Sequence, residues 1–390
     1  MKRINKNLLI VLILGISFGV STIFAQPTSK SEEDKKVSIG GYGQIDFNKP
    51  FIPNQNSNSK LDIHRMVLLF GYEYNKRLSF LTEIEFEHVT EVYVEQAYLN
   101  YAFSPSLNFR AGLLLIPMGI INEYHEPSSF NGVERPLLDT RIIPSTWREI
   151  GMGLTGQVTA ASLTYQLYLV NGFASYDGSA KLKGVDALRG GRQKGAESFM
   201  SSPNLSAKIS YHGILGLELG LSGYFGKTQS SLYNGIDFTN KDLVQKADSS
   251  VVGVSMMAFD YRYRLGNFRS RGQVVYSNLS NTDAYNKFTG RDLGSALFGY
   301  YAEVSYVIPF NMQDQQHEVE PFVRWEHYNT HFDVAGDLTA NDSYSYNGIG
   351  VGVGYRFHEN AVFKIDYILY RNGTDTLNSG VFNMGVGVNF

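Results

Sequence analysis

The last ten residues, VFNMGVGVNF, place an apolar side chain at every second position: Phe382, Met384, Val386, Val388 and Phe390. Side chains of a β-strand point alternately to opposite faces, so this spacing predicts a strand with one apolar face. A final strand with this period and a terminal aromatic residue is typical of β-barrels that close within an outer membrane. Any amphipathic edge strand could end in Phe, so the interpretation requires the same pattern along the rest of the chain.

The amino-terminal stretch has the layout of a secretory signal peptide. Basic residues precede an apolar run over 8–24, and the small Ala25 follows that run. We therefore expect residues 1–25 to be a signal peptide rather than a retained signal anchor, since glycine and serine dilute the apolar run. The polar segment 26–36 is expected to be a flexible periplasmic lead-in to a single domain over 37–390.

Composition favours a chain rich in strands and close turns. It contains 39 Gly, 26 Tyr and 25 Phe but only 11 Pro, and β-strands are enriched in aromatic residues. The mean hydropathy is only -0.18, as expected if lipid-facing and water-facing residues alternate. A formal net charge of -3 excludes a strongly basic nucleic-acid binder. The absence of cysteine means that disulfides play no part in an exported fold.

Counting alternating segments gives about sixteen candidate strands, with about fourteen as the architectural alternative. They fall near residues 37–48, 61–75, 77–88, 91–104, 107–116, 150–158, 162–171, 203–212, 214–227, 250–263, 267–279, 295–309, 317–329, 345–357, 361–371 and 381–390. Since no later stretch resembles a spanning helix, a membrane location would require a barrel.

Short and long connections alternate between these strands. The short turns fall at 75–76, 104–106, 160–161, 212–213, 265–266 and 358–360, with a longer one near 309–316. The long segments are 49–60, 117–149, 172–202, 228–249, 280–294, 330–344 and 372–380, and only the link near 89–90 breaks the alternation. Short periplasmic turns on one rim and long external loops on the other are typical of a transmembrane antiparallel barrel.

The two faces of the strands separate as a barrel requires, with polar side chains predicted to point into an aqueous interior. The basic residues predicted to face the interior are Arg65, Arg110, Lys208, Arg262, Arg269, Arg271, Arg324, Arg356 and Lys364. The acidic ones are Asp46, Glu73, Glu83, Glu85, Glu87, Glu218, Asp260, Glu303, Glu326 and Asp366. The sharpest local feature is the row Glu83, Glu85 and Glu87 beside Arg65, which is explained equally well by solvated wall polarity or by a solute site.

The longest connection, 117–149, is the candidate constriction. It carries apolar residues including Ile120, Ile121, Phe130 and Trp147, which would be costly on a loop in water. We therefore expect this third loop to fold inward and set the aperture. The alternative is a loop that covers the mouth or contacts a neighbouring subunit.

The stretch 61–157 resembles the phosphate-selective porin O and P family of Bacteroidetes-type outer membranes. The matching features are Glu83 to Phe86, Glu95 to Tyr101, Arg110 to Gly119 ending in Pro-x-Gly, and Trp147 to Gly156. The resemblance implies a sixteen-stranded porin, commonly trimeric, with an inward third loop.

The chain departs from that family in its charges. Anion-selective members carry dense lysine and arginine along the pore, whereas here Arg135, Arg141 and Arg148 face an acidic excess in the third loop. This departure argues against phosphate selectivity. The basic run Lys181, Lys183, Arg189, Arg192 and Lys194 is explained by a solvated external loop, with binding of lipid head-group phosphates an equal alternative.

These observations predict an outer-membrane porin, exported from a Gram-negative cell and surrounded by outer-membrane lipid, that passes small hydrophilic solutes or ions, anions such as phosphate among them. The eight histidines are scattered and no catalytic or metal-binding motif is present, so we expect no catalytic residue, metal or cofactor. The predicted selectivity residues are Arg65, Glu83, Glu85, Glu87, Arg110, Arg135, Arg141, Arg148, Arg269, Arg271 and Arg324. A barrel that binds a partner as an adhesin, and less plausibly a barrel hydrolase, are the alternatives.

Overall fold

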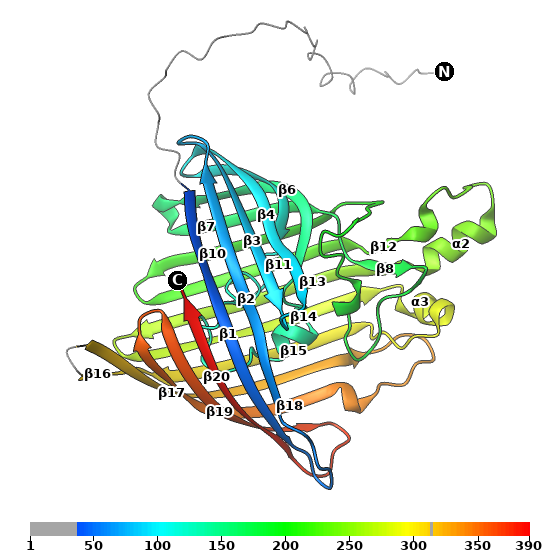
Figure 1. The fold of residues 1–390 in the computed structure, drawn as a ribbon. Coiled ribbons are helices and arrows are strands. Elements are labelled where there is room, and N and C mark those ends of the chain that lie inside the picture. The colour runs from blue at the N-terminus through cyan, green and yellow to red at the C-terminus, as the bar shows by residue number, and fades with distance from the viewer. Residues whose placement is uncertain (1–36, 313–314) are drawn as a thin grey trace, which may run out of the picture. The chain divides into compact units, whose positions relative to one another are not determined.

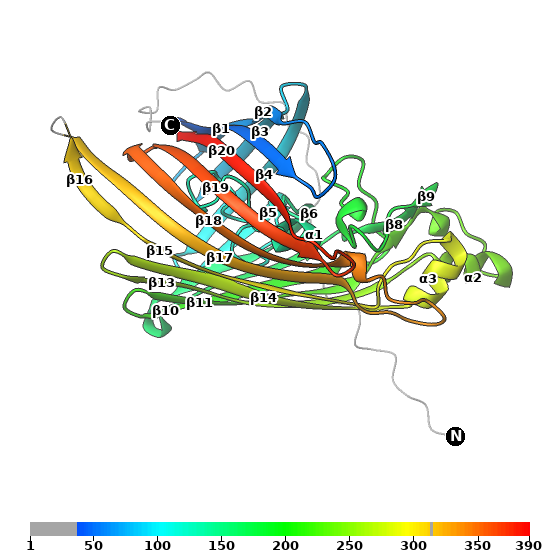
Figure 2. The same ribbon diagram turned by 90° about the horizontal axis from the view of Figure 1, so that it is seen from below.

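The structure is a computed structural model that describes residues 37–312 and 315–390. The expected signal peptide over 1–25 and the expected lead-in over 26–36 lie outside the described residues. The described chain forms one large antiparallel sheet that curves round on itself, as Figures 1 and 2 show from two sides.

Seventeen strands make up this sheet. β15 and β16 follow each other along the chain and both pair with β17, so together they cross the wall once. The wall therefore consists of sixteen spanning strands, which we call staves. In sequence order the staves are β1 (Val37–Phe51), β2 (Lys60–Glu73), β3 (Leu78–Glu87), β4 (Glu91–Ser104), β5 (Leu107–Leu115), β6 (Arg148–Val158), β7 (Leu163–Val170), β10 (Asn204–Ile214), β11 (Leu217–Lys227), β13 (Gly253–Leu265), β14 (Phe268–Ser280), β15 (Ala296–Tyr306) with β16 (Ile308–Met312), β17 (Gln315–Asp333), β18 (Ser345–His358), β19 (Ala361–Asn372) and β20 (Ser379–Asn389).

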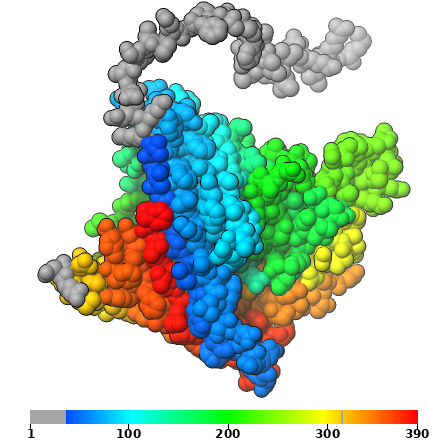
Figure 3. Space-filling model, viewed as in Figure 1, coloured from blue at the N-terminus to red at the C-terminus, as the bar shows by residue number. Residues whose placement is uncertain are grey.

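The barrel closes where the first and last strands meet. β1 pairs antiparallel with both β2 and β20, and the Phe390 amide donates to the Gly41 carbonyl over 2.9 Å. Figure 3 shows these two ends of the chain side by side on the surface. The prediction of a closed antiparallel barrel of about sixteen strands is therefore confirmed. Both edges of the first and last strands are paired, and among the described strands of the wall only β16 pairs with a single neighbour, β17, so an edge stays open along it.

The two rims differ as the connection lengths predict. One rim carries short turns and the β16 hairpin, and the other carries the long connections (Figure 1). The long connections contain structure that the sequence analysis did not predict, namely α1 (Leu138–Arg141), α2 (Lys241–Ser249), α3 (Thr282–Thr289) and a small sheet of β8 (Ala174–Asp177), β9 (Ser179–Ala180) and β12 (Gln229–Ser230). For α2 a local signal existed, because the Asn240 side chain caps the amides of Asp242 and Leu243.

Outward side chains on the staves are apolar and exposed, and inward ones are polar. On β14, for example, Val274 and Tyr276 are exposed whereas Gln273 is buried, and on β18 Ile349 and Val351 are exposed. Among the described residues, no helix is long and apolar enough to cross a membrane.

Two β-bulges interrupt this alternation at positions that matter for the interior. In the pairing of β1 with β2 the extra residue is His64 of β2, and in the pairing of β3 with β4 it is Glu95 of β4. A bulge inserts one extra residue and re-aims the side chains around it. As a result His64 and Arg65 both reach interior partners, and so do Glu95 and Gln96.

Candidate permeation path

The segment between β5 and β6, residues 116–147, lies inside the barrel and reaches walls on opposite sides of the bore. We call it the inserted segment; α1 is part of it (Figure 2). Most of its apolar side chains are fully buried, among them Ile116, Met118, Ile121, Phe130, Leu138, Ile142, Ile143 and Trp147, whereas Tyr124 is exposed. Burial of this surface repays the cost of ordering so long a connection.

Hydrogen bonds hold the inserted segment to widely separated staves. The amide of Val133 donates to Asp366 on β19 over 2.6 Å, and the amide of Leu138 donates to Glu326 on β17 over 2.5 Å. On the facing wall, Lys208 of β10 donates to the Gly119 carbonyl over 2.6 Å. These contacts place the inserted segment across the bore, and that it sets the aperture stays a prediction.

A buried charge cluster joins the inserted segment to β3 and β4. His125 Nε2 lies 2.7 Å from Glu95 Oε2 and 3.7 Å from Glu83 Oε1, and all three residues are almost fully buried. Arg148 also pairs with Glu95, and the Tyr42 hydroxyl donates to Glu83. Burial alone would lower the pKa of His125, but Glu95 and Glu83 outweigh it and raise that pKa to about 9. His125 is therefore a cation at neutral pH.

Two groups of side chains have the spacing of metal ligands. The donor atoms of Glu83, Glu95 and His125 lie within 4.8 Å of one another, as do those of Asp46, His64 and Glu134. Cations already balance both groups, since Arg148 pairs with Glu95, and Arg65 Nη2 lies 3.0 Å from His64 Nε2. A divalent ion would have to compete with these guanidinium groups, so the geometry fits ion pairing better than metal binding.

On the side of the long connections, a cavity of about 320 Å³ opens between the inserted segment, β2 to β4 and the loop after β7. We call it the basic cavity. Its lining consists of His64, Arg65, Glu85, Glu87, Tyr93, Glu134, Arg135, Leu137, Thr140, Ser145, Thr146, Arg148, Arg189, Arg192 and Lys194. Six Arg or Lys side chains thus face three carboxylates. The lining has an excess of positive charge.

Crowding and burial of these cations shift their pKa values. Burial, followed by the charge of Arg65, lowers the pKa of Arg135 to about 10. Burial, followed by Arg189 and Arg148, lowers the pKa of Arg192 to about 9. Both groups stay protonated at neutral pH, so the excess positive charge persists there.

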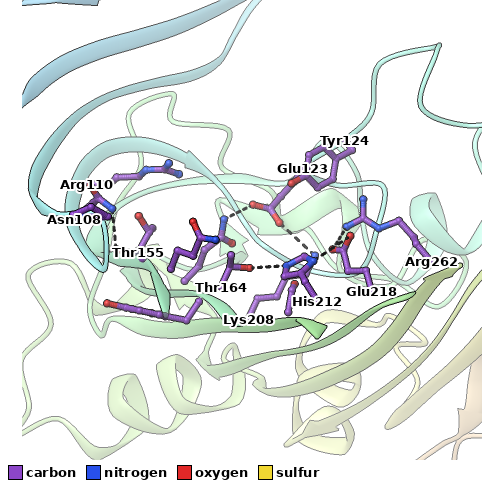
Figure 4. Close-up of a pocket in the computed structure, with 16 residues that line it drawn as sticks. Asn108, Arg110, Glu123, Tyr124, Thr155, Thr164, Lys208, His212, Glu218 and Arg262 are labelled. Carbon is purple, nitrogen blue, oxygen red and sulfur yellow. Dashed lines mark hydrogen bonds and ion pairs between the residues drawn. The ribbon is translucent and has the colours of Figure 1, made fainter. Parts of the chain in front are cut away.

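On the side of the short turns lies a larger cavity of about 530 Å³, the mixed-charge cavity (Figure 4). Its charged lining consists of Arg110, Glu123, Lys208, His212, Glu218 and Arg262. Here two of the three cations are paired: Lys208 Nζ lies 3.4 Å from Glu123, and Arg262 donates to Glu218. Arg110 donates to Asn100 over 3.1 Å.

A third cavity of about 210 Å³ adjoins the mixed-charge cavity, because Tyr124 and Arg262 line both. Arg269 and Arg271 line it as well. Arg269 donates to Glu320 over 3.0 Å, and Arg271 Nε donates to Glu303 over 2.8 Å. Arg264 and Arg356 complete the basic lining of this cavity, and Arg356 pairs with Glu318, so four of its five arginines have a carboxylate partner.

The predicted site residues separate into three places. Arg65, Glu85, Glu87, Arg135 and Arg148 line the basic cavity, Arg110 lines the mixed-charge cavity, and Arg269 and Arg271 line the third. Glu83 belongs to the His125 cluster. Arg324 is buried 3.7 Å from Glu303, and Arg141 pairs with Asp186, so neither lines these three cavities. A selectivity role for the whole set stays a prediction.

Sequence reasoning missed several lining residues. The interpretation of Arg189, Arg192 and Lys194 as part of a solvated loop is wrong, because all three line the basic cavity. Arg189 donates to the Ser145 carbonyl over 2.7 Å, and Arg192 donates to the Pro144 carbonyl over 3.1 Å. No signal in the sequence places this loop against the inserted segment.

A curated relative covers most of the chain. An uncharacterised protein of Aquifex aeolicus (strain VF5) is 32% identical over 344 residues, which is 86% of this chain and 76% of that protein. The chain belongs to the same family as that protein. No model of a known protein family matches the chain, so the resemblance to the phosphate-selective porin O and P family stays a prediction.

Solved structures support the fold of this family member. An anion-selective porin from Comamonas acidovorans aligns with a TM-score of 0.58 at 11% identity, over 92% of this chain and 100% of that one. The outer membrane channel DcaP of Acinetobacter baumannii aligns with a TM-score of 0.57 at 12% identity, over 93% of this chain and 99% of that one. At such low identity the likeness shows that the chain has the porin fold.

Proposed function

We propose that the protein is an outer-membrane channel through which small hydrophilic solutes diffuse passively. One observation carries this proposal: charged cavities lie on both sides of the inserted segment, inside a barrel whose outward face is apolar. Charged linings are costly unless water or a polar solute reaches them. The apolar exterior fits a lipid surround.

The route runs along the interior face of β3 to β5. Below the basic cavity, Glu83 accepts from Gln96 over 2.7 Å. Further along, Arg110 lies 5.0 Å from the centre of the Tyr98 ring and lines the mixed-charge cavity. We infer that solutes pass along these polar side chains from one cavity to the other and that the buried His125 cluster limits their passage.

The finer part of the proposal concerns selectivity and assembly. Excess positive charge at the long-connection end favours entry of anions, phosphate among them, because a charged mouth raises the local concentration of counter-ions. The homotrimer implied by the family resemblance is the assembly we propose. Crosslinking in the native membrane tests the trimer independently of transport.

Liposome swelling tests the channel itself. Vesicles that contain the folded protein should swell in isotonic monosaccharide and more slowly in a trisaccharide, whereas protein-free vesicles should not swell. Planar bilayers should show discrete conductance steps. Folded protein that gives neither flux nor current would contradict the proposal and favour the partner-binding alternative.

A hydroxyl, an imidazole and a carboxylate lie in a row in the mixed-charge cavity. Thr164 Oγ1 lies 3.3 Å from His212 Nε2, and His212 Nδ1 lies 3.9 Å from Glu218. The hydroxyl belongs to threonine and the row is partly exposed, so the arrangement falls short of a hydrolytic triad. Incubation of the purified protein with phospholipid tests this alternative, and we expect no turnover.

A further inference from the structure

We propose that the basic cavity is a binding site for small organic anions that carry hydroxyl groups, with phosphorylated sugars as the best match. The inference deepens the proposed channel and rests on it for the solute's access to the site. Three features of the cavity support the inference. It has an arginine without a partner, it has an excess of positive charge, and it has hydrogen-bond acceptors around a volume larger than that of one phosphate ion.

Guanidinium groups of the lining come from three elements: Arg65 from β2, Arg135 from the inserted segment and Arg148 from β6. Arg65 is only 3% exposed; its Nη1 lies 3.5 Å from Glu85, and its Nε has no hydrogen-bond partner within the described part of the chain. Arg148, 2% exposed, leaves Nε without a partner there as well. Within the same residues, no hydrogen bond or ion pair reaches Arg135 on the inserted segment. The unpartnered Nε atoms of Arg65 and Arg148 are enclosed, whereas Arg135 is half-buried and lines the cavity, so Arg135 is the guanidinium group best placed to receive an acceptor from a solute.

Positive charge at the site is not cancelled by its own hydrogen bonds. Arg189 and Arg192 donate to backbone carbonyls of the inserted segment, which are neutral acceptors. Lys194 lies 4.5 Å from the centre of the Tyr93 ring. Among the six cations Arg65 pairs with Glu85 and Arg148 with Glu95, which leaves Glu87 and Glu134 as the lining carboxylates that oppose the other four. His64 adds no charge while its Nε2 accepts from Arg65. An anionic group would therefore enter a positive field and find guanidinium donors that suit an oxyanion.

The remaining lining fits a hydroxylated body rather than a bare oxyanion. Glu87, Glu134 and Thr140 offer acceptors for hydroxyl groups, and Tyr93 offers a ring face. Carboxylates offer no hydrogen bond to a phosphate oxygen but accept hydrogen bonds from the hydroxyl groups of a sugar, so a phosphorylated sugar uses more of the lining than inorganic phosphate does. The volume of about 320 Å³ lies at the lower end of the range for sites that hold small organic ligands.

Blockage of the ion current tests the site. The wild-type protein in planar bilayers is titrated from the long-connection side with glucose 6-phosphate, inorganic phosphate and glucose. We expect glucose 6-phosphate to block at a concentration about tenfold below that of inorganic phosphate, the difference expected from about one extra net hydrogen bond. Glucose alone should block only weakly, because it lacks the anionic group.

Two variants sharpen the assignment. Arg135→Gln should raise the half-blocking concentration of glucose 6-phosphate at least tenfold, since it removes a charge-assisted hydrogen bond. Lys183→Gln is the matched control, because Lys183 is basic and belongs to the same loop as Arg189 but does not line the cavity. Glu87→Gln should strengthen the block by inorganic phosphate and should not strengthen the block by glucose 6-phosphate. An increase for both anions would mean that Glu87 only repels charge, which would overturn the sugar component.

Equilibrium binding to detergent-solubilised protein separates the two proposals. A protein that conducts ions but binds none of the three probes would overturn the site and leave the channel standing. A protein that binds glucose 6-phosphate but carries no current would overturn the channel and leave the site. Inorganic phosphate that binds as tightly as glucose 6-phosphate would overturn the organic-anion class.

Discussion

The basic cavity and the mixed-charge cavity lie in one barrel and are both lined by the inserted segment, yet they differ in how far their charged side chains are paired. In the mixed-charge cavity Lys208 and Arg262 each have a carboxylate partner. In the basic cavity Arg135 has none among the described residues, and Arg192 donates only to carbonyls. A paired charge is largely neutral to a passing ion, whereas an unpaired one is not.

For the channel proposed above, this contrast predicts that ion selectivity arises at the end of the bore that carries the long connections. The short-turn end then acts as a wide polar exit with little preference. It also explains how a chain with a formal net charge of -3 can favour anions. Local charge in a low-dielectric mouth matters more than the sum over the sequence.

Removal of the inserted segment should have the largest effect, because it abolishes the boundary between the two cavities. Replacement of residues 117–146 by a short Gly-Ser linker should raise single-channel conductance severalfold and abolish the preference for anions. A deletion of 335–341, which lies on the outer rim between β17 and β18, serves as the control and should leave conductance unchanged. A barrel that conducts equally with and without the inserted segment would show that the segment does not limit flow.

Single substitutions compare the two cavities directly. Arg65→Ala should shift the reversal potential in asymmetric salt toward cation preference, because it removes a cation and leaves Glu85 without its partner. Arg110→Ala should cause a smaller shift, since this residue lies in the mixed-charge cavity, where the other two cations are paired. If Arg110→Ala has the larger effect, the contrast between the cavities is wrong. If neither shifts the potential, these residues do not line the conducting path.

The wall of the barrel could be predicted from the sequence because its signal is repeated. Period-two alternation and the order of short and long connections located every stave within a few residues, as for 345–357 against Ser345–His358. The position of the inserted segment also followed from its apolar content. Each of these predictions rests on burial, because buried or lipid-facing positions are occupied by apolar residues whose spacing can be read from the sequence.

The site was predicted only in part because its key residues depend on register and on contacts between distant segments. His64 and Glu95 reach the interior through bulges, and the sequence does carry a trace of both. The apolar residues of the alternating pattern change from odd to even positions between Ile63 and Met66, and from even to odd positions between Val94 and Ala97. The approach of Arg189 and Arg192 to the inserted segment leaves no local trace, since a basic loop looks the same in water.

The boundary between the cavities should weaken in alkali, because it depends on protonated His125. The pKa of His125 is raised from its ordinary value to about 9 by Glu95 and Glu83, against the effect of burial. Its contribution is therefore complete below about pH 6.5 and is lost as the pH rises through about 9, with a magnitude of about 3 kcal/mol.

We expect the wild-type current to become noisier, and the urea midpoint to fall, between pH 7 and pH 9.5. His125→Gln should remove this pH dependence, and His212→Gln, at an exposed histidine in the mixed-charge cavity, should retain it. Arg192, with a pKa of about 9, and Arg135, with a pKa of about 10, are present in both variants, so the difference between the variants isolates the contribution of His125. A wild-type midpoint that is flat over this range would show that the cluster does not hold the segment.

The smallest effect is expected at Asp139, where the inserted segment meets the wall away from both main cavities. Gln273 donates to Asp139 Oδ1 over 2.8 Å, but Oδ2 has no partner among the described residues. Burial, with a further contribution from Glu326, raises the pKa of Asp139 to about 7. The stability linked to its protonated form is complete below about pH 4 and is lost as the pH rises through about 7.

Asp139→Asn keeps the acceptor for Gln273 and cannot ionise, so it should stabilise the protein at pH 8 by about 1–3 kcal/mol and have little effect at pH 4. Urea titrations of the detergent-solubilised variant at both pH values measure this difference. Asp186→Asn is the control, because Asp186 pairs with Arg141 and Lys183 near the surface and its loss should cost at most about 1 kcal/mol. Asp139 lines neither the basic nor the mixed-charge cavity. A gain in stability at pH 8 with unchanged ion selectivity would therefore show that the attachment of the inserted segment to the wall does not determine selectivity. A changed selectivity would mean instead that the position of the segment sets the charge seen by the ion.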